Sequence, residues 1–127
     1  MTHGGKIWWN ELNTWKPDEA KAFYERTLGW SFDEVPGKPG QAPYWVAKRD
    51  GQSVCGIFTL RSPDFDGIQS HWFTYLAVDD IDTALAQAIA TGGQVKREKF
   101  EIPGFGTMAV VMDNTGAGFG MIEPASH

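Results

Sequence analysis

The sequence predicts an α+β fold in which two βαβββ repeats form a single domain of 127 residues. Three observations support this fold class. Short segments of alternating apolar and polar residues indicate strands. Two segments with apolar residues at helical spacing, each followed by glycine, indicate helices. The second half of the chain also repeats the first at a constant offset of 64 residues, which indicates an internal duplication.

The first repeat covers about residues 6–60. Residues 6–14 alternate between two faces and predict a strand. A helix begins at Pro17, whose fixed φ suits a first helical position, and Gly29 ends it. Three strands follow near residues 30–35, 43–49 and 53–60, separated by turn-forming segments. Residues 61–70 are polar, with Pro and Gly, and predict a surface linker.

The second repeat covers about residues 71–123. A strand at 71–78 is followed by Asp79 and Asp80, which are candidate helix caps. The helix that they begin ends at Gly92 and Gly93. Further strands are expected near residues 94–101, 106–113 and 117–122. Between the first two of these strands, the sequence IPGFG at 102–106 fits either a mobile lid or a plain tight turn.

The offset of 64 needs no gap. It places the helix-ending Gly29 on Gly93 and the strand residue Gly56 on Gly120, and it also aligns Val46 with Val110 and Leu12 with Leu76. Helical alanines alone match easily by chance, but glycines that end helices and glycines within strands rarely share one offset. An ancestral duplication therefore explains the pattern better than chance does.

Composition excludes several classes of protein. The net charge is -5 and the basic residues are scattered, so nucleic acid is not an expected partner. No stretch approaches the roughly 20 apolar residues of a membrane helix, so we expect no membrane partner. The single cysteine, Cys55, allows no disulfide framework, which fits a cytoplasmic location. Six tryptophans fit either a ring-rich core or a ring-lined pocket.

Several motifs carry a family resemblance when they are taken in this order: Trp9-x-Glu11-Leu12, Phe23-Tyr24, Leu28-Gly29-Trp30, Trp72-x-x-Tyr75-x-x-Val78-Asp79-Asp80, Gly92-Gly93-x-Val95, Ile102-Pro103-Gly104-x-Gly106 and Asp113-x-x-Gly116-Ala117-x-Phe119-Gly120. Together they resemble the vicinal-oxygen-chelate superfamily of glyoxalase I, extradiol dioxygenases and bleomycin resistance proteins. The most similar branch is that of the 27-kDa-antigen-type, glyoxalase-like proteins. The resemblance covers nearly the whole chain.

This resemblance implies a cupped mixed sheet with the helices outside and a small molecule inside. In metal-using members four inward side chains bind one divalent ion, and these positions correspond to Trp9, Gly56, Phe73 and Gly120. Indole, phenyl and hydrogen offer no lone pair to a metal. Both pairs of positions are separated by the repeat offset of 64, which supports the alignment. We therefore expect no metal cofactor, with a divalent metal at other ligands as the alternative.

Alternation along the strands predicts a ligand site inside the cup. Trp9 and Glu11 should point inward from the first strand, and Phe73 and Tyr75 from the fifth. Glu11 is also the candidate catalytic residue, because a carboxylate on an apolar face needs a partner or a shifted pKa. It fits contact with a cationic or hydrogen-donating ligand as well as internal pairing with Arg49, Arg61 or Tyr75. Two further residues, Trp45 and Phe58, are weaker candidates for the pocket wall.

Three functions fit this site. The first is a protein that binds a small aromatic or cationic molecule without chemistry. The second is a lyase-like or dioxygenase-type enzyme that acts through Glu11 or through a metal. The third is an interaction module whose cup is filled by its own rings. For each of them the expected assembly is a homodimer.

Overall fold

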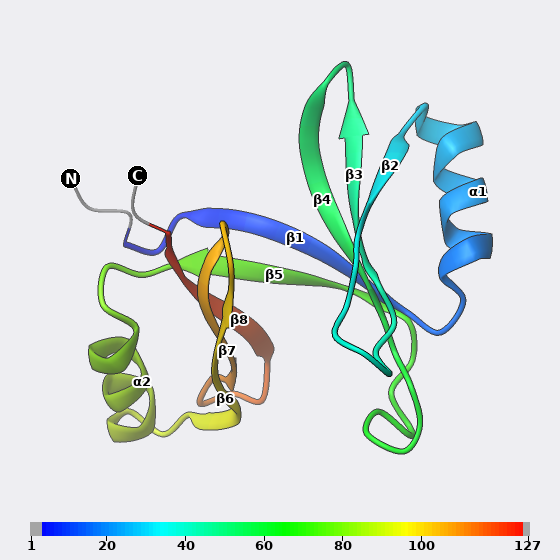
Figure 1. The fold of residues 1–127 in the computed structure, drawn as a ribbon. Coiled ribbons are helices and arrows are strands. Elements are labelled where there is room, and N and C mark those ends of the chain that lie inside the picture. Colours follow the sequence, from blue (N-terminus) through cyan, green and yellow to red (C-terminus); the bar gives the residue numbers. More distant parts are fainter. Residues whose placement is uncertain (1–3, 126–127) are drawn as a thin grey trace. The chain divides into compact units, whose positions relative to one another are not determined.

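The computed structural model describes residues 4–125 and divides them into two compact units. Residues 9–72 form what we call the first unit, and residues 4–8 with 73–125 form the second unit. The elements run in the order βαβββ twice (Figure 1). They are β1 Ile7–Thr14, α1 Pro17–Leu28, β2 Ser31–Val35, β3 Tyr44–Arg49, β4 Gln52–Thr59, β5 His71–Ala77, α2 Ile81–Ala90, β6 Gln94–Ile102, β7 Gly106–Met112 and β8 Gly118–Pro124.

In the first unit the strands lie in the order β2-β3-β4-β1, with β1 and β4 parallel and the other neighbours antiparallel. The α1 helix begins at Pro17, and Asp18 and Glu19 lie in its first turn, where carboxylates complement the positive end of the helix. Gly29 ends the helix in the left-handed conformation, with φ 71°, and its N–H donates to the Glu25 carbonyl oxygen. The predicted start and end of this helix are confirmed.

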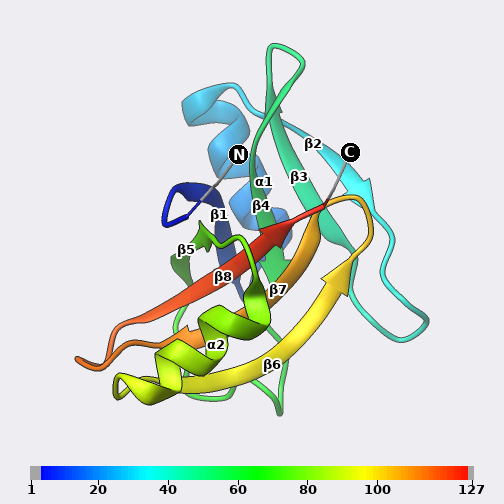
Figure 2. The ribbon, with the colours of Figure 1, turned by 90° about the vertical axis from the view of Figure 1, so that its left-hand side faces the viewer.

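In the second unit the order is β5-β8-β7-β6, with β5 and β8 parallel. The Asp80 carboxylate caps α2 by accepting the Thr83 N–H at 3.2 Å. The helix then lies across β6, β7 and β8 (Figure 2). Its buried Ile81 and Leu85 pack into an apolar core with three strand residues, Ala109, Val111 and Met121.

The two units repeat each other in register as well as in element order. Glu11 pairs with Gly56 between β1 and β4, and Tyr75 pairs with Gly120 between β5 and β8, one repeat offset later. In the same way Val46 pairs with Gly56, and Val110 pairs with Gly120. The α+β fold of two βαβββ repeats is therefore confirmed.

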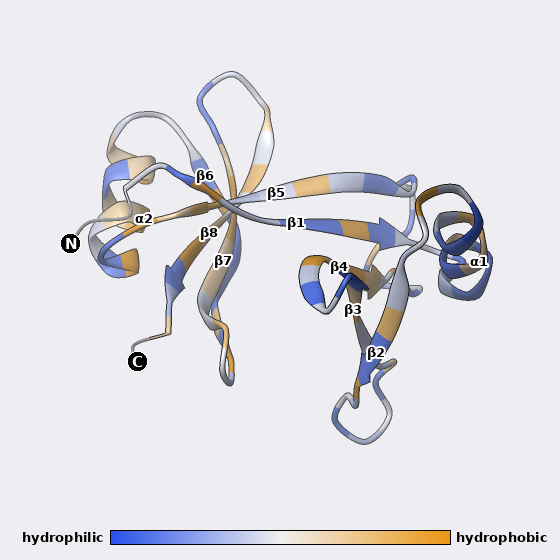
Figure 3. Ribbon diagram, turned by 90° about the horizontal axis from the view of Figure 1, so that it is seen from above, coloured by the Kyte–Doolittle hydropathy of each residue, from blue (hydrophilic) through white to orange (hydrophobic). Residues whose placement is uncertain are grey.

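The helices of the two units differ in character. α2 is rich in apolar residues, whereas α1 is mainly hydrophilic (Figure 3). None of the residues of α1, all of which the structure describes, is buried. No helix within residues 4–125 is both long and apolar enough to cross a bilayer. The segment at 102–106 forms a tight turn in which the Phe105 N–H donates to the Ile102 carbonyl oxygen at 3.0 Å.

Candidate functional site

The strands of the first unit present two faces, because successive side chains of a strand point in opposite directions. Register places one set on what we call the Glu11 face: Trp9, Glu11, Asn13, Tyr44, Val46, Gly56 and Phe58. The opposite set lies on the helix face, towards α1: Leu12, Thr14, Trp45, Ala47, Cys55 and Ile57. The candidate polar site lies on the Glu11 face.

Glu11 belongs to a short chain of hydrogen bonds. The Tyr44 hydroxyl donates to the Glu11 Oε2 atom at 2.8 Å, and the Trp9 indole N–H donates to the Tyr44 oxygen at 2.9 Å. Glu11 is only 5% exposed. A carboxylate buried on a sheet costs free energy unless donors reach it, and the phenol is such a donor. The chain therefore holds an acceptor in a fixed position beside an indole ring.

Tyr44 also fills the space that Gly56 leaves open. A Cβ atom added at Gly56 would overlap the Tyr44 hydroxyl and ring. Gly56 is one of the four positions that the family resemblance assigns to metal ligands, and a phenol occupies the space into which a side chain there would project. Tyr44 is not among the residues that the sequence patterns predict for the site. One sequence signal could have identified it. Val46 aligns with Val110 at the repeat offset, which indicates the register of this strand, and Tyr44, two residues before Val46, must lie on the same face.

The other candidates of the first unit separate between the two faces. The structure places Trp45 on the helix face, with the Lys21 ammonium 3.1 Å from its ring centroid, so it does not meet Glu11. Because strand side chains alternate, its neighbour Tyr44 takes the place expected of Trp45. Phe58 lies on the Glu11 face and packs edge-to-face on Phe65, with 5.5 Å between ring centroids.

The two arginines that are candidate partners of Glu11 bind backbone oxygens. Arg49 Nη1 donates to the Gly29 carbonyl at 3.2 Å, and Arg61 Nη1 donates to the Gly40 carbonyl at 2.8 Å. These hydrogen bonds connect Arg49 to the C-terminal end of α1 and Arg61 to the loop that precedes β3. The phenol of Tyr44 reaches the Glu11 carboxylate from β3, across the intervening strand β4.

Asn13 adds a second acceptor to the Glu11 face. His71 Nδ1 lies 2.7 Å from the Gln69 carbonyl oxygen, so this nitrogen carries the proton and Nε2 is an acceptor. The Asn13 amide N–H donates to that Nε2 at 3.2 Å. Its Oδ1 atom is buried and accepts no hydrogen bond among the described residues. Such an orphaned acceptor is rare in folded proteins and marks a place where a donor fits.

Cys55 lies beneath this site and is only 3% exposed. Burial, and then the negative charge of Glu11, raise the pKa of its thiol to about 11, from an ordinary 9.0. The unfolded thiol therefore ionises at a lower pH than the folded one. This contribution to stability is complete below pH 9 and is lost as the pH rises through about 11.

We expect iodoacetamide to alkylate Cys55 far more slowly in the native protein at pH 8 than in urea, since only the thiolate reacts. Replacing Glu11 with Gln should lower the pKa of Cys55, because it removes a negative charge while keeping the shape. Mass spectrometry of the alkylated protein across pH 7–10 measures both effects. Equal native and unfolded rates would contradict the burial of this thiol.

In the second unit the counterparts of Trp9 and Glu11 are Phe73 and Tyr75. Their rings pack edge-to-face, with 5.4 Å between centroids. Tyr75 lies beside Gly120, and a Cβ atom added at Gly120 would overlap the Tyr75 ring. Each unit therefore has a tyrosine ring in the space next to a strand glycine. The two tyrosines come from β3 and β5, which are not equivalent strands of the two repeats. The duplication therefore does not explain why both glycines have a tyrosine ring beside them.

The side chains at the family's metal-ligand positions do not fit the divalent ion that its metal-using members bind. The four corresponding positions hold Trp9, Gly56, Phe73 and Gly120, and tyrosine rings fill the space at both glycines. Within residues 4–125, no three His, Cys, Asp or Glu side chains gather in a way that could hold a metal ion. We therefore derive no chemical step through a metal at these positions.

Some known proteins are similar to this chain in sequence, and others are similar in fold. A protein of Mycobacterium tuberculosis named "Putative glyoxylase CFP32" is 42% identical over 95% of this chain and 45% of its own length. The Streptomyces peucetius anthracycline biosynthesis protein DnrV is 30% identical over 87% of this chain and 44% of its own. The chain thus spans less than half the length of these curated relatives.

Among solved structures, the methylmalonyl-CoA epimerase of Mycobacterium tuberculosis has a TM-score of 0.68 with 13% identity, covering 99% of this chain and 92% of that one. That likeness concerns the fold alone. Residues 7–120 match the sequence pattern of one superfamily, from β1 to β8. The chain belongs to the Glyoxalase/Bleomycin resistance protein/Dioxygenase superfamily.

Proposed function

We propose that this protein binds a small aromatic or cationic molecule on the Glu11 face without the help of a metal ion. The observation that carries the proposal is the buried Glu11 carboxylate, which the Tyr44 hydroxyl holds at 2.8 Å. Trp9 adds an indole ring beside it. A carboxylate next to an aromatic face attracts cations by charge and flat rings by stacking.

The pattern of acceptors favours a ligand that donates hydrogen bonds. Glu11 and Asn13 lie two residues apart on one face of β1, and the buried Asn13 Oδ1 accepts no hydrogen bond among the described residues. Two acceptors beside aromatic rings suit an N–H donor, such as a protonated amine or a cationic ring nitrogen. Anionic ligands fit poorly here, because the carboxylate would repel them.

The metal-free part of the proposal rests on side-chain chemistry. Indole, phenyl and two glycines stand at the family's ligand positions, and the Tyr44 and Tyr75 rings fill the space at the glycines. Neutral phenols are weak ligands for a divalent ion in comparison with imidazole and carboxylate. Binding in this protein would therefore come from the carboxylate and the rings.

A second candidate function is metal-independent proton transfer. The Tyr44 hydroxyl and the Glu11 carboxylate form a donor–acceptor pair, and a relative 42% identical is named as a glyoxylase. In a lyase-like reaction Glu11 would act as the base that takes a proton from a bound substrate. Turnover of a hemithioacetal that is lost in Glu11→Gln and kept in Glu34→Gln would favour this function over binding alone.

Replacing Glu11 with Gln is expected to weaken the binding of a cationic planar probe, proflavine, by at least about tenfold, since it removes the charge and keeps the shape. Tyr44→Phe should weaken it less, because the carboxylate remains. The matched control is Glu34→Gln, which makes the same charge change at an exposed position of β2. Fluorescence titration measures all four proteins. Equal affinities in Glu11→Gln and Glu34→Gln would contradict the proposed site.

Metal content and assembly complete the proposal, which includes a homodimer in the cytoplasm. Elemental mass spectrometry of protein purified without chelator should find well below one metal ion per chain. Stoichiometric zinc, nickel, manganese or iron would contradict the metal-free part and favour the enzyme.

Light scattering after size exclusion should give twice the chain mass of 14.1 kDa, and a monomer at all concentrations would refute the dimer.

A further inference from the structure

The helix face of the first unit contains a cavity of about 340 Å³. Leu12 and Thr14 of β1 line this cavity, as do Ala20, Phe23 and Tyr24 of α1. Ser70, His71 and Trp72 complete the lining, and the cavity is largely open to solvent. Its volume is at the lower end of the range of pockets that hold small molecules. Because Leu12 and Thr14 alternate with Glu11 and Asn13, the cavity lies on the opposite side of β1 from the proposed site.

We propose that this cavity binds an uncharged planar aromatic molecule that carries a hydrogen-bond acceptor. The proposal does not rest on the Glu11 site: apart from His71, which also accepts the Asn13 amide N–H, it uses other residues, on the other face of the strands. It rests on three features of the first unit: a helix that buries no side chain of its own, a set of partly exposed rings, and a pair of hydroxyls fixed by backbone donors.

The first feature emerges when the two helices are compared. In the second unit α2 buries Ile81 and Leu85 in a core against its strands. One repeat offset earlier, α1 has Pro17 and Lys21 at those positions. The Lys21 ammonium lies over the Trp45 ring instead of filling the interface with an aliphatic side chain. No side chain of α1 is therefore fully buried against the sheet, whereas α2 buries two.

The second feature is the set of rings around this space. Tyr24 stacks on Trp30 with 5.1 Å between centroids, and the edge of Trp72 meets Tyr24 at 5.7 Å. The Trp72 indole N–H donates to the Tyr24 hydroxyl at 3.2 Å, which fixes both rings. Yet Phe23 is 59% and Trp72 46% exposed. Fixed rings with so much exposed area can cover a flat ligand without first being ordered.

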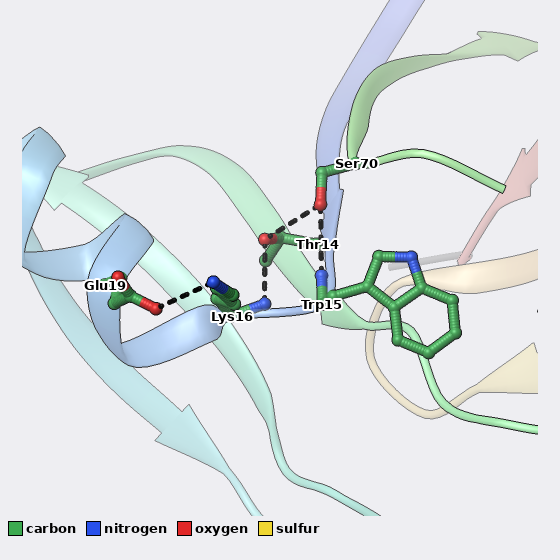
Figure 4. A network of polar contacts seen from close by, with 5 residues as sticks. All are labelled: Thr14, Trp15, Lys16, Glu19 and Ser70. Carbon is green, nitrogen blue, oxygen red and sulfur yellow. Dashed lines mark hydrogen bonds and ion pairs between the residues drawn. The ribbon is translucent and has the colours of Figure 1, made fainter.

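The third feature is a network of polar contacts around Thr14 and Ser70, two residues that line the cavity (Figure 4). The Thr14 hydroxyl accepts the Lys16 N–H at 3.1 Å and the Ser70 hydroxyl at 3.3 Å. The Ser70 oxygen in turn accepts the Trp15 N–H at 3.1 Å. Each of the two oxygens already accepts a backbone N–H, so the bond between the hydroxyls, whichever of them donates, uses one of their two protons and leaves the other. A carbonyl or ether oxygen of a ligand is the partner that this proton fits.

The residues that line the cavity disfavour a charged ligand. Among the described residues that line the cavity, no carboxylate, ammonium or guanidinium group is present. Lys16, which belongs to the polar network, is exposed and pairs with Glu19 at 3.7 Å, so both charges stay in water. A charged ligand would lose its hydration against apolar walls without gaining a counter-ion. The occupant that fits is therefore neutral, mainly apolar and flat.

The test uses prodan, a neutral naphthalene ketone whose emission shifts to the blue when it leaves water. We expect saturable binding of one probe per chain with a blue-shifted emission. Ala20→Phe fills the cavity and should weaken binding at least about tenfold, and Trp72→Ala should do the same by removing a wall. Thr14→Val, which removes one of the two hydroxyls, should weaken it by a smaller factor. The matched control, Ala22→Phe, adds the same ring at an exposed position of the same helix and should leave binding unchanged.

Two further measurements establish where on the protein prodan binds. Glu11→Gln should leave prodan affinity unchanged, and loss of affinity in that variant would move the probe to the Glu11 face and overturn the proposal. Sedimentation with and without prodan tests whether a second copy of the chain covers the rings, and exclusion of the probe on dimerisation would also overturn it. Thermal melts confirm that each variant is folded. If Ala20→Phe does not fold, Trp72→Ala still decides, because its ring is nearly half exposed.

Discussion

Gly56→Ala is expected to destabilise the protein by about 2–3 kcal/mol, because the new methyl group displaces the Tyr44 hydroxyl and breaks its hydrogen bonds to Trp9 and Glu11. Glycine backbone freedom plays no part here, since Gly56 does not have a positive φ. The loss comes from a buried carboxylate whose phenol donor has moved. Urea unfolding of the wild type and the variant measures it.

A double-mutant cycle identifies the cause. In a Tyr44→Ala background the space beside Gly56 is vacant, so the same Gly56→Ala change should cost less than about 1 kcal/mol. The matched control is Gly118→Ala, another strand glycine, where an added Cβ would make only ordinary contacts, at 3.7 Å from Phe73 and 4.0 Å from the Val111 oxygen. A cost at Gly56 that is the same with and without Tyr44 would show that the phenol does not fill this position.

Gly106→Ala is expected to cost about 3 kcal/mol or more. Gly106 has φ 143°, which residues with a side chain avoid. An added Cβ atom would also overlap the Glu123 carbonyl oxygen and lie 3.0 Å from the Pro124 Cα atom. These are backbone atoms of β8, the neighbouring strand, so relief would require opening the β7–β8 pairing. A lower melting temperature and faster hydrogen exchange in β8 should result.

Gly104 in the same turn provides the control. Its φ is 85°, but an added Cβ would meet nothing within 4 Å. Gly104→Ala should therefore cost only the strain of the left-handed backbone, about 1 kcal/mol. The difference between the two variants isolates the contact with β8. Equal losses of unfolding free energy would contradict the close approach at Gly106.

Most of the fold was predictable from local patterns. Pro17 and Gly29 mark the ends of α1, Asp80 caps α2, and the strand boundaries follow alternation to within a residue or two. The repeat offset added long-range information, because it predicted equivalent positions before any pairing was known. The observed register, Glu11 with Gly56 and Tyr75 with Gly120, agrees with that offset.

The candidate site was only partly predictable. Alternation predicts that Glu11 and Trp9 lie on the same face, because their strand is long enough for the pattern to define which residues share a face. Trp45 and Tyr44 are adjacent in a short strand, where a shift of one residue exchanges the faces, and the structure places Tyr44 beside Glu11. The helix-face cavity left a weaker signal, the substitution of Lys21 for Leu85 at equivalent positions.

By itself, then, the sequence determined the order of elements, the repeat and the family, because periodicity, caps and residue chemistry are local properties. Only the tertiary structure decided that the Tyr44 hydroxyl reaches Glu11, that its ring fills the space at Gly56, and that α1 lines a cavity whereas α2 packs into a core. Those outcomes depend on the distances and volumes between side chains from separate strands and helices, which no local pattern specifies.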